Sequence, residues 1–229
     1  MSRKIIGAGI IVLLCLTVII RLLSKVYQQE QPGRETQVTK PEYGEPLPWE
    51  EVQALFPRYA AAVVEDMETG KRFEVTRRGG IYHADVQPLT IQDTRTMQEI
   101  YAGGWSWKRR AVIVEIGSVR LAASMNGMPH GSGRIRENDF QGHFCLHFLQ
   151  CKVHASKKVD PAHQMMVWKA AGQPLRPYLE AGPREVLELV FTALNQGDGG
   201  LALLGVEPEN NEDLWLAAYS LLGQLPEIE

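Results

Sequence analysis

AVIVEIGSVRLAAS, residues 111–124, is the stretch that decides the fold. Its two halves, AVIVEI and VRLAAS, are short apolar runs rich in β-branched residues, which favour extended backbone. Gly117 and Ser118 stand between them as a tight two-residue connection. The stretch therefore predicts a β-hairpin.

Further elements surround this hairpin. A second hairpin is predicted from 61–66 and 72–76, and a short buried strand from His143–Phe148. Thr90 and Asp93 have the spacing of a capping box and mark the start of a helix. Helical patterns are expected at 49–56, 91–101, 161–171, 183–194 and 212–222.

The predicted organisation has four parts. Residues 1–26 are expected to form a transmembrane anchor, 27–48 a polar linker, 49–174 a histidine-rich domain and 175–229 a helical tail. The fold class is accordingly α+β: an N-terminal transmembrane helix, a tether, a mixed and mostly β catalytic-like domain with a few helices, and a C-terminal helical hairpin.

The anchor rests on Ile5–Ile20, an apolar run without a charge, which follows Arg3 and Lys4. An uncleaved anchor competes with a cleaved signal peptide and with a buried core helix; no small-x-small site follows the run, which favours the anchor. The sequence thus predicts a single-pass membrane protein whose C-terminal domain lies outside the cytoplasm.

Composition limits the class of partner. The 229 residues carry a formal net charge of -3, and 45% of them are hydrophobic, as in an ordinary globular protein. Because the chain has no overall basic field, a nucleic-acid partner is not expected. A peptidoglycan or other cell-envelope polymer is the expected partner instead.

All histidines fall within one part of the chain. They lie between Gly80 and Ala170, together with two of the three cysteines. A lone histidine is more often a surface or packing residue than a catalyst, but their concentration in one domain indicates a chemical site. The six are His83, His130, His143, His147, His154 and His163.

Cys145 is the candidate nucleophile. A thiol needs a nearby base to become a thiolate at neutral pH, and His130 lies fifteen residues upstream. In an extended strand, His143 and His147 share a face with Cys145. Two structural alternatives remain open: Cys145 could be a buried structural thiol, or it could form a disulfide with Cys151.

A glycine-, proline- and asparagine-rich stretch, 126–142, separates the hairpin from the strand that carries Cys145. It is too long for a simple turn, so a functional loop is expected there. Its Asn126, Gly127 and Gly131, with the aromatic Trp105 and Trp107 before the hairpin, are the candidate substrate-binding residues.

At these residues the chain resembles the L,D-transpeptidase catalytic domain, in which a His-Gly pair precedes a Ser-x-Gly-Cys-(Ile/Val)-Arg segment. His130 and Gly131 are similar to the pair, and Gly142–His147 to the segment; the likeness covers about residues 110 to 150. It implies a mostly β fold outside the cell, Cys145 attacking a peptidoglycan stem peptide, His130 or His143 as base, and backbone amides around Cys145 holding the oxyanion.

Three positions depart from that family. Gly142 stands in place of Ser, Phe144 in place of Gly and His147 in place of Arg. Because Phe144 has a large side chain where the family has glycine, it affects how closely the backbone can approach the substrate, as an oxyanion hole requires. The loss of Arg removes a group that fixes a carboxylate, and His147 replaces it only when protonated.

Two other classes of function fit the same residues. His83, Asp85 and His147 are potential ligands of a zinc ion with an open water position, as in a wall metallopeptidase; the His143–His147 and His154–His163 pairs could complete such a set. Without zinc no cofactor is expected. Alternatively, Trp105 and Trp107 could stack on a sugar in a non-catalytic cell-wall-binding module, or could simply pack within the fold.

Overall fold

The computed structural model describes residues 43–154 and 156–205. Within them the chain forms two compact units, which are divided in the sequence between Pro177 and Tyr178. Each unit is described by itself.

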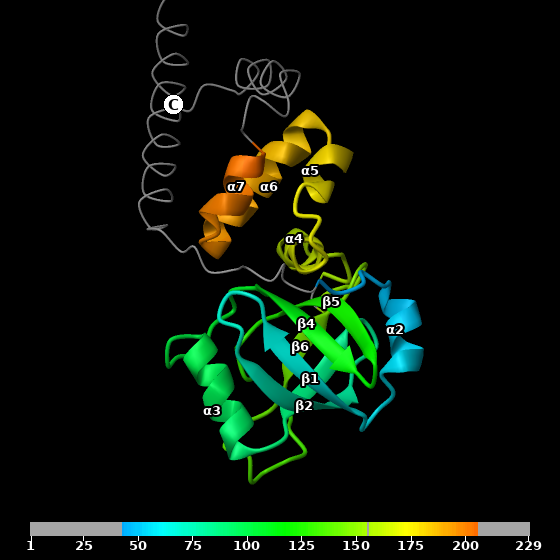
Figure 1. Cartoon of the computed structure of the whole chain (residues 1–229), viewed down its shortest axis with the longest axis vertical. Helices are drawn as coiled ribbons and strands as arrows, with labels where there is room; N and C mark the ends of the chain where they lie inside the picture. The colour runs from blue at the N-terminus through cyan, green and yellow to red at the C-terminus, as the bar shows by residue number, and fades with distance from the viewer. Residues whose placement is uncertain (1–42, 155, 206–229) are drawn as a thin grey trace, which may run out of the picture. The chain divides into compact units, whose positions relative to one another are not determined.

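The first unit is built on a closed antiparallel β-barrel (Figure 1). The order of strands around it is β1-β2-β3-β6-β5-β4, and β4 pairs with β1 to complete the ring. A closed barrel leaves no strand edge unpaired along the ring. Its strands are β1 (Ala61–Asp66), β2 (Arg72–Gly79), β3 (Ala84–Pro88), β4 (Arg110–Ile116), β5 (Val119–Met125) and β6 (Phe144–His147).

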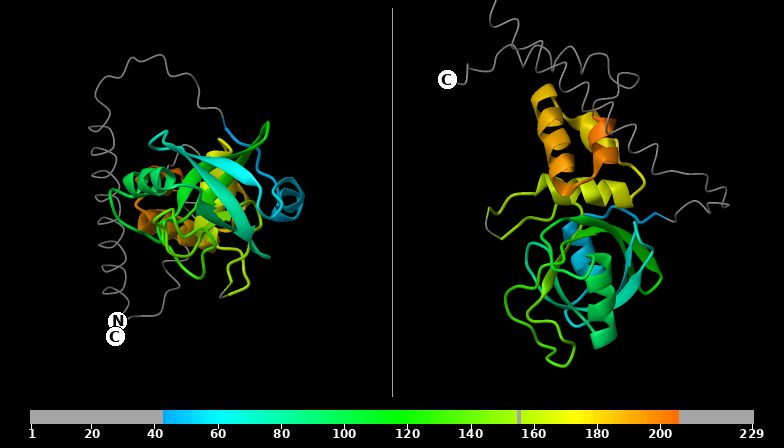
Figure 2. Two further views of the ribbon diagram at one scale, coloured as in Figure 1. Left: turned by 90° about the horizontal axis from the view of Figure 1, so that it is seen from below. Right: turned by 90° about the vertical axis from the view of Figure 1, so that its left-hand side faces the viewer.

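Three helices accompany the barrel. α2 (Trp49–Leu55) and α3 (Ile91–Ile100) lie on opposite sides of it, as the views in Figures 1 and 2 show. α4 (Pro161–Ala170) packs against β4, β5 and β6. The second unit contains most of α5 (Arg176–Glu180), followed by α6 (Pro183–Gln196) and α7 (Gly199–Leu204).

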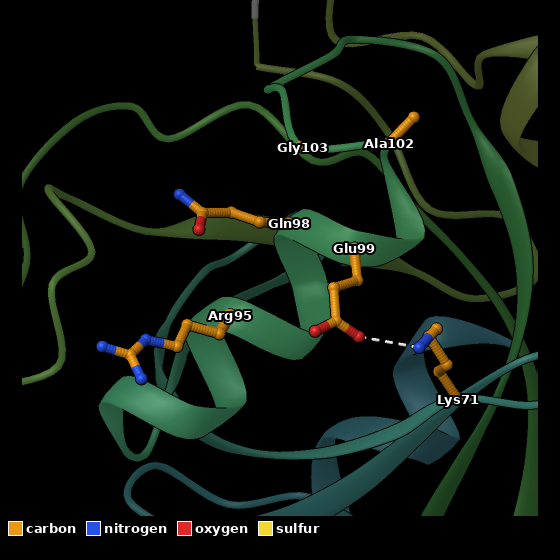
Figure 3. A pocket seen from close by; sticks show the side chains of 6 residues that line it. All are labelled: Lys71, Arg95, Gln98, Glu99, Ala102 and Gly103. Atoms are coloured by element: carbon orange, nitrogen blue, oxygen red, sulfur yellow. Dashed lines mark hydrogen bonds and ion pairs between the residues drawn. The ribbon is translucent and has the colours of Figure 1, made fainter.

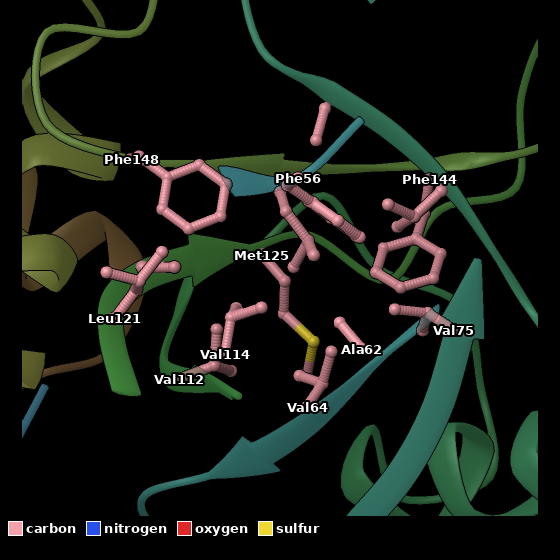
Figure 4. Close-up of a cluster of buried hydrophobic side chains, with 14 of the residues drawn as sticks. Phe56, Ala62, Val64, Val75, Val112, Val114, Leu121, Met125, Phe144 and Phe148 are labelled. Atoms are coloured by element: carbon pink, nitrogen blue, oxygen red, sulfur yellow. The ribbon is translucent and has the colours of Figure 1, made fainter. Parts of the chain in front are cut away.

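The inside of the barrel is filled by one apolar cluster (Figure 4). Alternate residues of each strand point inward, as the pleat requires, so Val64 of β1, Val75 of β2 and Val114 of β4 meet there. Leu121 of β5 and Phe144 of β6 complete the ring of inward side chains. The outward residues of the same strands are therefore available for other roles.

Several predicted elements are confirmed. The two hairpins appear as β1–β2 and β4–β5, both antiparallel. Thr90 caps α3: its side chain accepts the N–H of Asp93, whose carboxylate accepts the N–H of Thr90 in return. The predicted helices at 49–56, 161–171 and 183–194 correspond to α2, α4 and α6.

The predicted fold class is wrong: this is a small mixed α/β protein built on a closed six-stranded barrel. Closure depends on pairings between strands distant in the sequence, β1 with β4 and β3 with β6. No strand was predicted at β3, whose outward Asp85 and Gln87 are polar although both are buried. The predicted helix at 212–222, half of the expected hairpin, lies outside the described residues.

The prediction of a single-pass membrane protein is also corrected. No helix in the described part of the chain is long and apolar enough to cross a membrane. The anchor predicted at 1–26 and most of the linker at 27–48 lie outside the described residues.

Candidate functional site

The candidate site lies on the outer face of the barrel, where β3, β6 and β5 run side by side. On β6, Phe144 and Leu146 point into the core, so Cys145 and His147 face outward between them. Both outward residues are nevertheless buried, because α4 and the neighbouring loops cover this face. The expectation that Cys145 and His147 share a face of one strand is confirmed.

The register of the sheet brings further polar residues to this face. Asp85 of β3 pairs with Cys145, and Ser124 of β5 pairs with His147. Side chains of paired residues lie on the same face of an antiparallel sheet. His83, just before β3, stacks its ring on His147 with the ring centroids 4.3 Å apart. The pairing of the strands thus places histidine, carboxylate and thiol groups side by side on this face.

Cys145 and His130 form a thiol–imidazole pair. The Sγ of Cys145 lies 3.2 Å from Nε2 of His130, and Nδ1 of the same ring lies 2.8 Å from the carbonyl oxygen of Met128. A carbonyl only accepts hydrogen bonds, so Nδ1 carries the proton of the neutral ring and Nε2 is the acceptor. The Cys145 thiol therefore donates to His130, which is oriented as a base.

A tight backbone bridge places His130 beside the strand. His130 and His143 exchange both N–H···O bonds, at 2.9 and 2.8 Å. Gly142 has φ +95°, and a Cβ there would lie 2.3 Å from the carbonyl oxygen of His130. Gly131 has φ +62°, and a Cβ there would lie 2.4 Å from Cε1 of His143. The bridge therefore requires glycine at 142, where the resembled family has serine.

Asp85 is surrounded by imidazole rings. Its Oδ1 lies 3.4 Å from Nε2 of His83, 3.8 Å from Nε2 of His143 and 4.0 Å from Nε2 of His154. Burial alone would raise the pKa of the Asp85 carboxyl, but a hydrogen bond from His83 and the charges that His143, His83 and His154 carry when protonated outweigh it, and the pKa is lowered. Asp85 is therefore an ionised carboxylate among nitrogen donors.

Two of these rings are held by backbone carbonyls. Nδ1 of His83 lies 2.8 Å from the carbonyl oxygen of Lys152, and Nδ1 of His143 lies 3.1 Å from that of Ser132. When such a ring is neutral, it donates from Nδ1, as His130 does, and leaves the lone pair of Nε2 directed inward. His130 and His143, from the connection between β5 and β6, and His83, from just before β3, thus present the same nitrogen to the space around Asp85 and Cys145.

Behind this group His147 and His163 form a buried stack. Their ring centroids are 3.6 Å apart with an interplanar angle of 8°, and Nδ1 of His163 lies 2.9 Å from Oγ of Ser124. Burial lowers the pKa of His147 well below its ordinary value, and that of His163 to about 3. Both rings are neutral at pH 7, so His147 does not provide the positive charge of the arginine it replaces.

The two cysteines of the domain are separate free thiols. Burial raises the pKa of Cys145, so this thiol keeps its proton at neutral pH until a base removes it. Cys151 lies in the apolar core, where its sulfur accepts the N–H of Phe148 at 3.1 Å and its pKa is raised to about 12. The disulfide alternative is therefore excluded in this structure, and Cys151 is a packing residue.

The candidate substrate-binding residues divide into different environments. Trp105 packs edge to face on Phe140, with centroids 5.2 Å apart, and belongs to the fold. Trp107 is half exposed, and its ring lies 5.1 Å from that of His130. Asn126 is buried, and its Oδ1 has no hydrogen-bond partner. Of these candidates, Trp107 is therefore the exposed one, and Asn126 is the buried one with an unpaired amide oxygen.

The remaining candidates act through the backbone. Gly127 donates its N–H to the carbonyl oxygen of Ser106 at 2.8 Å, and Gly131 makes room for the ring of His143. The loop 126–142 is tied down at its far side, where the side chain of Gln87 accepts the N–H groups of Arg134 and Ile135. These contacts hold the loop over the outer face of β3 and β6.

Sequence reasoning found most of the side chains that meet here, but not what orients them. The carbonyls of Met128, Ser132 and Lys152 belong to loop backbone and leave no sequence signal. His154 was named only as a partner of His163, whereas the structure groups it with His83 and Asp85. Separately, a surface hollow of about 590 Å³ lies beside α3 (Figure 3); its lining includes the ion-paired Lys71 and Glu99 and none of the histidines.

Comparisons of the chain with protein-family models, with curated proteins and with solved structures found no match.

Proposed function

We propose that this protein is a thiol acyltransferase that acts on peptide bonds, with Cys145 as the nucleophile and His130 as its base. The observation that carries the proposal is the hydrogen bond of 3.2 Å between the Cys145 thiol and His130 Nε2, with the other ring nitrogen fixed on Met128. A nucleophile, a base and a group that orients the base are the parts that covalent acyl transfer needs.

The chemistry proceeds in two balanced steps. As the sulfur of Cys145 bonds to the carbonyl carbon of the substrate, the thiol proton moves to Nε2 of His130, which then gives it to the departing amine. This leaves a thioester on Cys145. An amine of a second peptide, or water, then attacks the thioester, delivers its proton through His130 and restores the thiol.

The resemblance to L,D-transpeptidases suggests peptidoglycan stem peptides as the substrate. Phe144 replaces the family's glycine, but its side chain points into the barrel, so it does not cover the outer face where the thiol lies. His147 is neutral and stacked, so this chain has to fix a substrate carboxylate with a different group.

Access to the thiol requires movement. Cys145 is 4% exposed, beneath the loop 126–142, whereas the neighbouring Trp107 is 50% exposed. A substrate that enters beside Trp107 and His130 has to displace part of this loop, as active-site loops commonly do. Modification of Cys145 should accordingly be slow without substrate.

The test uses the purified full-length chain, stem peptides and mass spectrometry. Wild type should form a thioester adduct on Cys145 and release an amine product; Cys145→Ala should lose both, and His130→Gln should lower the rate at least about 100-fold. Cys151→Ala is the matched control, because it removes the other buried thiol of the domain and should retain the adduct. Turnover that persists in Cys145→Ala, or a wild type that forms neither adduct nor product, contradicts the proposal.

A further inference from the structure

We infer that His83, Asp85 and His154 form a binding site for one divalent transition-metal ion such as Zn²⁺, next to the thiol pair. The inference goes beyond the proposed acyl transfer and does not depend on it. Nε2 of His83, an oxygen of Asp85 and a ring nitrogen of His154 lie within 4.8 Å of one another. Two imidazoles and one carboxylate are a common ligand set for Zn²⁺.

The first supporting observation is a pair of buried atoms without partners. Nε2 of His83 and Oδ1 of Asp85 both lie out of contact with solvent and without a hydrogen bond, although they face each other at 3.4 Å. His83 is 2% exposed and Asp85 8% exposed. Buried polar atoms are nearly always satisfied, so two free lone pairs directed at one point favour a cation there.

The second observation is the tautomer of His83. Its Nδ1 donates to the carbonyl oxygen of Lys152 at 2.8 Å, which leaves the lone pair of Nε2 unprotonated and directed at Asp85. Metal-binding histidines almost always donate their second ring nitrogen to a carbonyl or carboxylate in this way. The arrangement fixes the ring before any ion arrives.

The ring planes separate this set from one of the two other sets of neighbouring ligand atoms, the second being His130, His143 and Cys145. His83, Cys145 and His147 also have ligand atoms within 4.8 Å of one another, but the rings of His83 and His147 are stacked at an angle of 23°. A metal lies in the plane of each imidazole that binds it, and nearly parallel rings cannot both direct an in-plane lone pair at one ion. The rings of His83 and His154 cross at 71°, so their lone pairs can converge.

The distances are compatible with a tetrahedral ion. Ligand atoms about 2.0–2.1 Å from zinc lie about 3.3 Å from one another. The pair His83–Asp85 already has nearly this spacing, at 3.4 Å, and Nε2 of His154 at 4.0 Å needs to move by less than about 1 Å. Because the side chain of His154 is 55% exposed, it can make this adjustment and gives the ion a path from solvent.

A fourth ligand is at hand. Nε2 of His143 lies 3.8 Å from Oδ1 of Asp85 and, like His83, its Nδ1 is held by a backbone carbonyl. Either this nitrogen or a water molecule completes the coordination, so the site stays open to exchange. The carboxylate and the neutral rings together give the electron-rich donor set that a divalent cation needs.

The experiment is a titration of the full-length chain with ZnSO₄ after chelator treatment, by isothermal calorimetry with elemental analysis of the dialysed product. One equivalent of Zn²⁺ should bind. His154→Ala, a change at an exposed side chain, should weaken binding at least about ten-fold, and Asp85→Asn should abolish it. Cys145→Ser is the matched control and should leave the affinity unchanged, since the thiol lies outside the proposed set.

Three results overturn the inference: no zinc bound by wild type, unchanged affinity in His154→Ala, or loss of binding in Cys145→Ser, which would assign the ion to the thiol set. Circular dichroism of each variant shows whether it folds. If Asp85→Asn does not fold, the zinc affinity of His154→Ala still decides the question. The thioester assay measures a different property, so either proposal can fail alone.

Discussion

Acid should destabilise the protein through His163, on the buried side of the histidine group. Burial lowers the pKa of this ring to about 3, against a value of 6.5 for a free histidine. The groups around it are Asp160 at the start of its own helix, Arg109 and His83, with His147 stacked on its face. Asp160 favours the charged ring, but desolvation dominates, and the folded protein holds His163 neutral.

The sign follows from proton linkage. Below pH 6.5 the unfolded chain takes up a proton on His163, whereas the folded protein does so only near pH 3. This contribution to stability is therefore fully present above pH 6.5 and is lost as the pH falls toward 3. With 1.36 kcal/mol for each pKa unit, the free energy of unfolding should drop by about 2 kcal/mol between pH 7 and pH 5 from this one group.

The assay is urea unfolding at pH 7 and pH 5, in the presence of a chelator, on wild type and His163→Gln. The variant should be less stable at pH 7, since it loses the contact with Ser124, but its loss of stability between the two pH values should be smaller by about 2 kcal/mol. Met166→Ala, another buried change on α4, is the control: it should lower stability about equally at both pH values.

An equal pH dependence of wild type and His163→Gln would refute this reasoning. That result would mean that the ring is protonated in the folded protein at pH 5, with Asp160 outweighing burial. A wild type that is more stable at pH 5 than at pH 7, with the variant lacking this gain, would reverse the sign and refute it as well.

Two further predictions concern the barrel and the loop. Asp66 is fully buried and accepts two hydrogen bonds from Arg110, at 2.7 and 2.8 Å. Arg110→Met should therefore lower the free energy of unfolding in urea by about 3 kcal/mol, and adding Asp66→Asn should recover part of that loss. Equal stabilities of Arg110→Met and wild type would contradict this. In Gly142→Ala the added Cβ would strike the carbonyl of His130, so this variant should form the thioester much more slowly than wild type. Gly117→Ala is the control, because no atom lies within 4 Å of its Cβ, and it should not slow thioester formation. Equal rates in the two variants would contradict the role of the bridge between His130 and His143.

The local elements could be predicted because their signals are local. The hairpin at 111–124 combines β-branched runs with a two-residue turn, and Thr90 with Asp93 forms the capping box that their spacing indicates. Each depends on residues only a few positions apart, so one sequence is enough to recognise them. Their boundaries differ from the structure by at most three residues.

Closure of the barrel could not be predicted, since it depends on pairings across long stretches of chain. In β3, Ala84 and Val86 point inward and the polar Asp85 and Gln87 point outward. A five-residue segment with polar side chains at two positions is also typical of a loop. Those polar side chains are buried because the loop 126–142 and neighbouring rings cover them, and this covering is a tertiary effect. Because β3 was not recognised as a strand, closure of the sheet into a barrel could not be predicted from the sequence.

The site was predictable in its components and not in its grouping. The resemblance around Cys145 pointed to His130, and the structure places the two within hydrogen-bonding distance. Asp85 was considered only as a metal ligand, yet its pairing with Cys145 across β3 and β6 puts it at the centre. That pairing depends on register, which no local pattern shows.

In this architecture, different parts of the chain determine the stability of the barrel and the reactivity of the thiol site. Asp85 and Cys145 are placed by a closed ladder of backbone hydrogen bonds, so their positions change only if the barrel itself is disturbed. His130 and His143 lie outside the strands and are oriented by single carbonyl contacts and by neighbouring glycines. Changes at Gly131 or Gly142 should therefore alter the reactivity of the thiol while the core of β-strands stays intact, which is how a rigid scaffold permits one loop to set its chemistry.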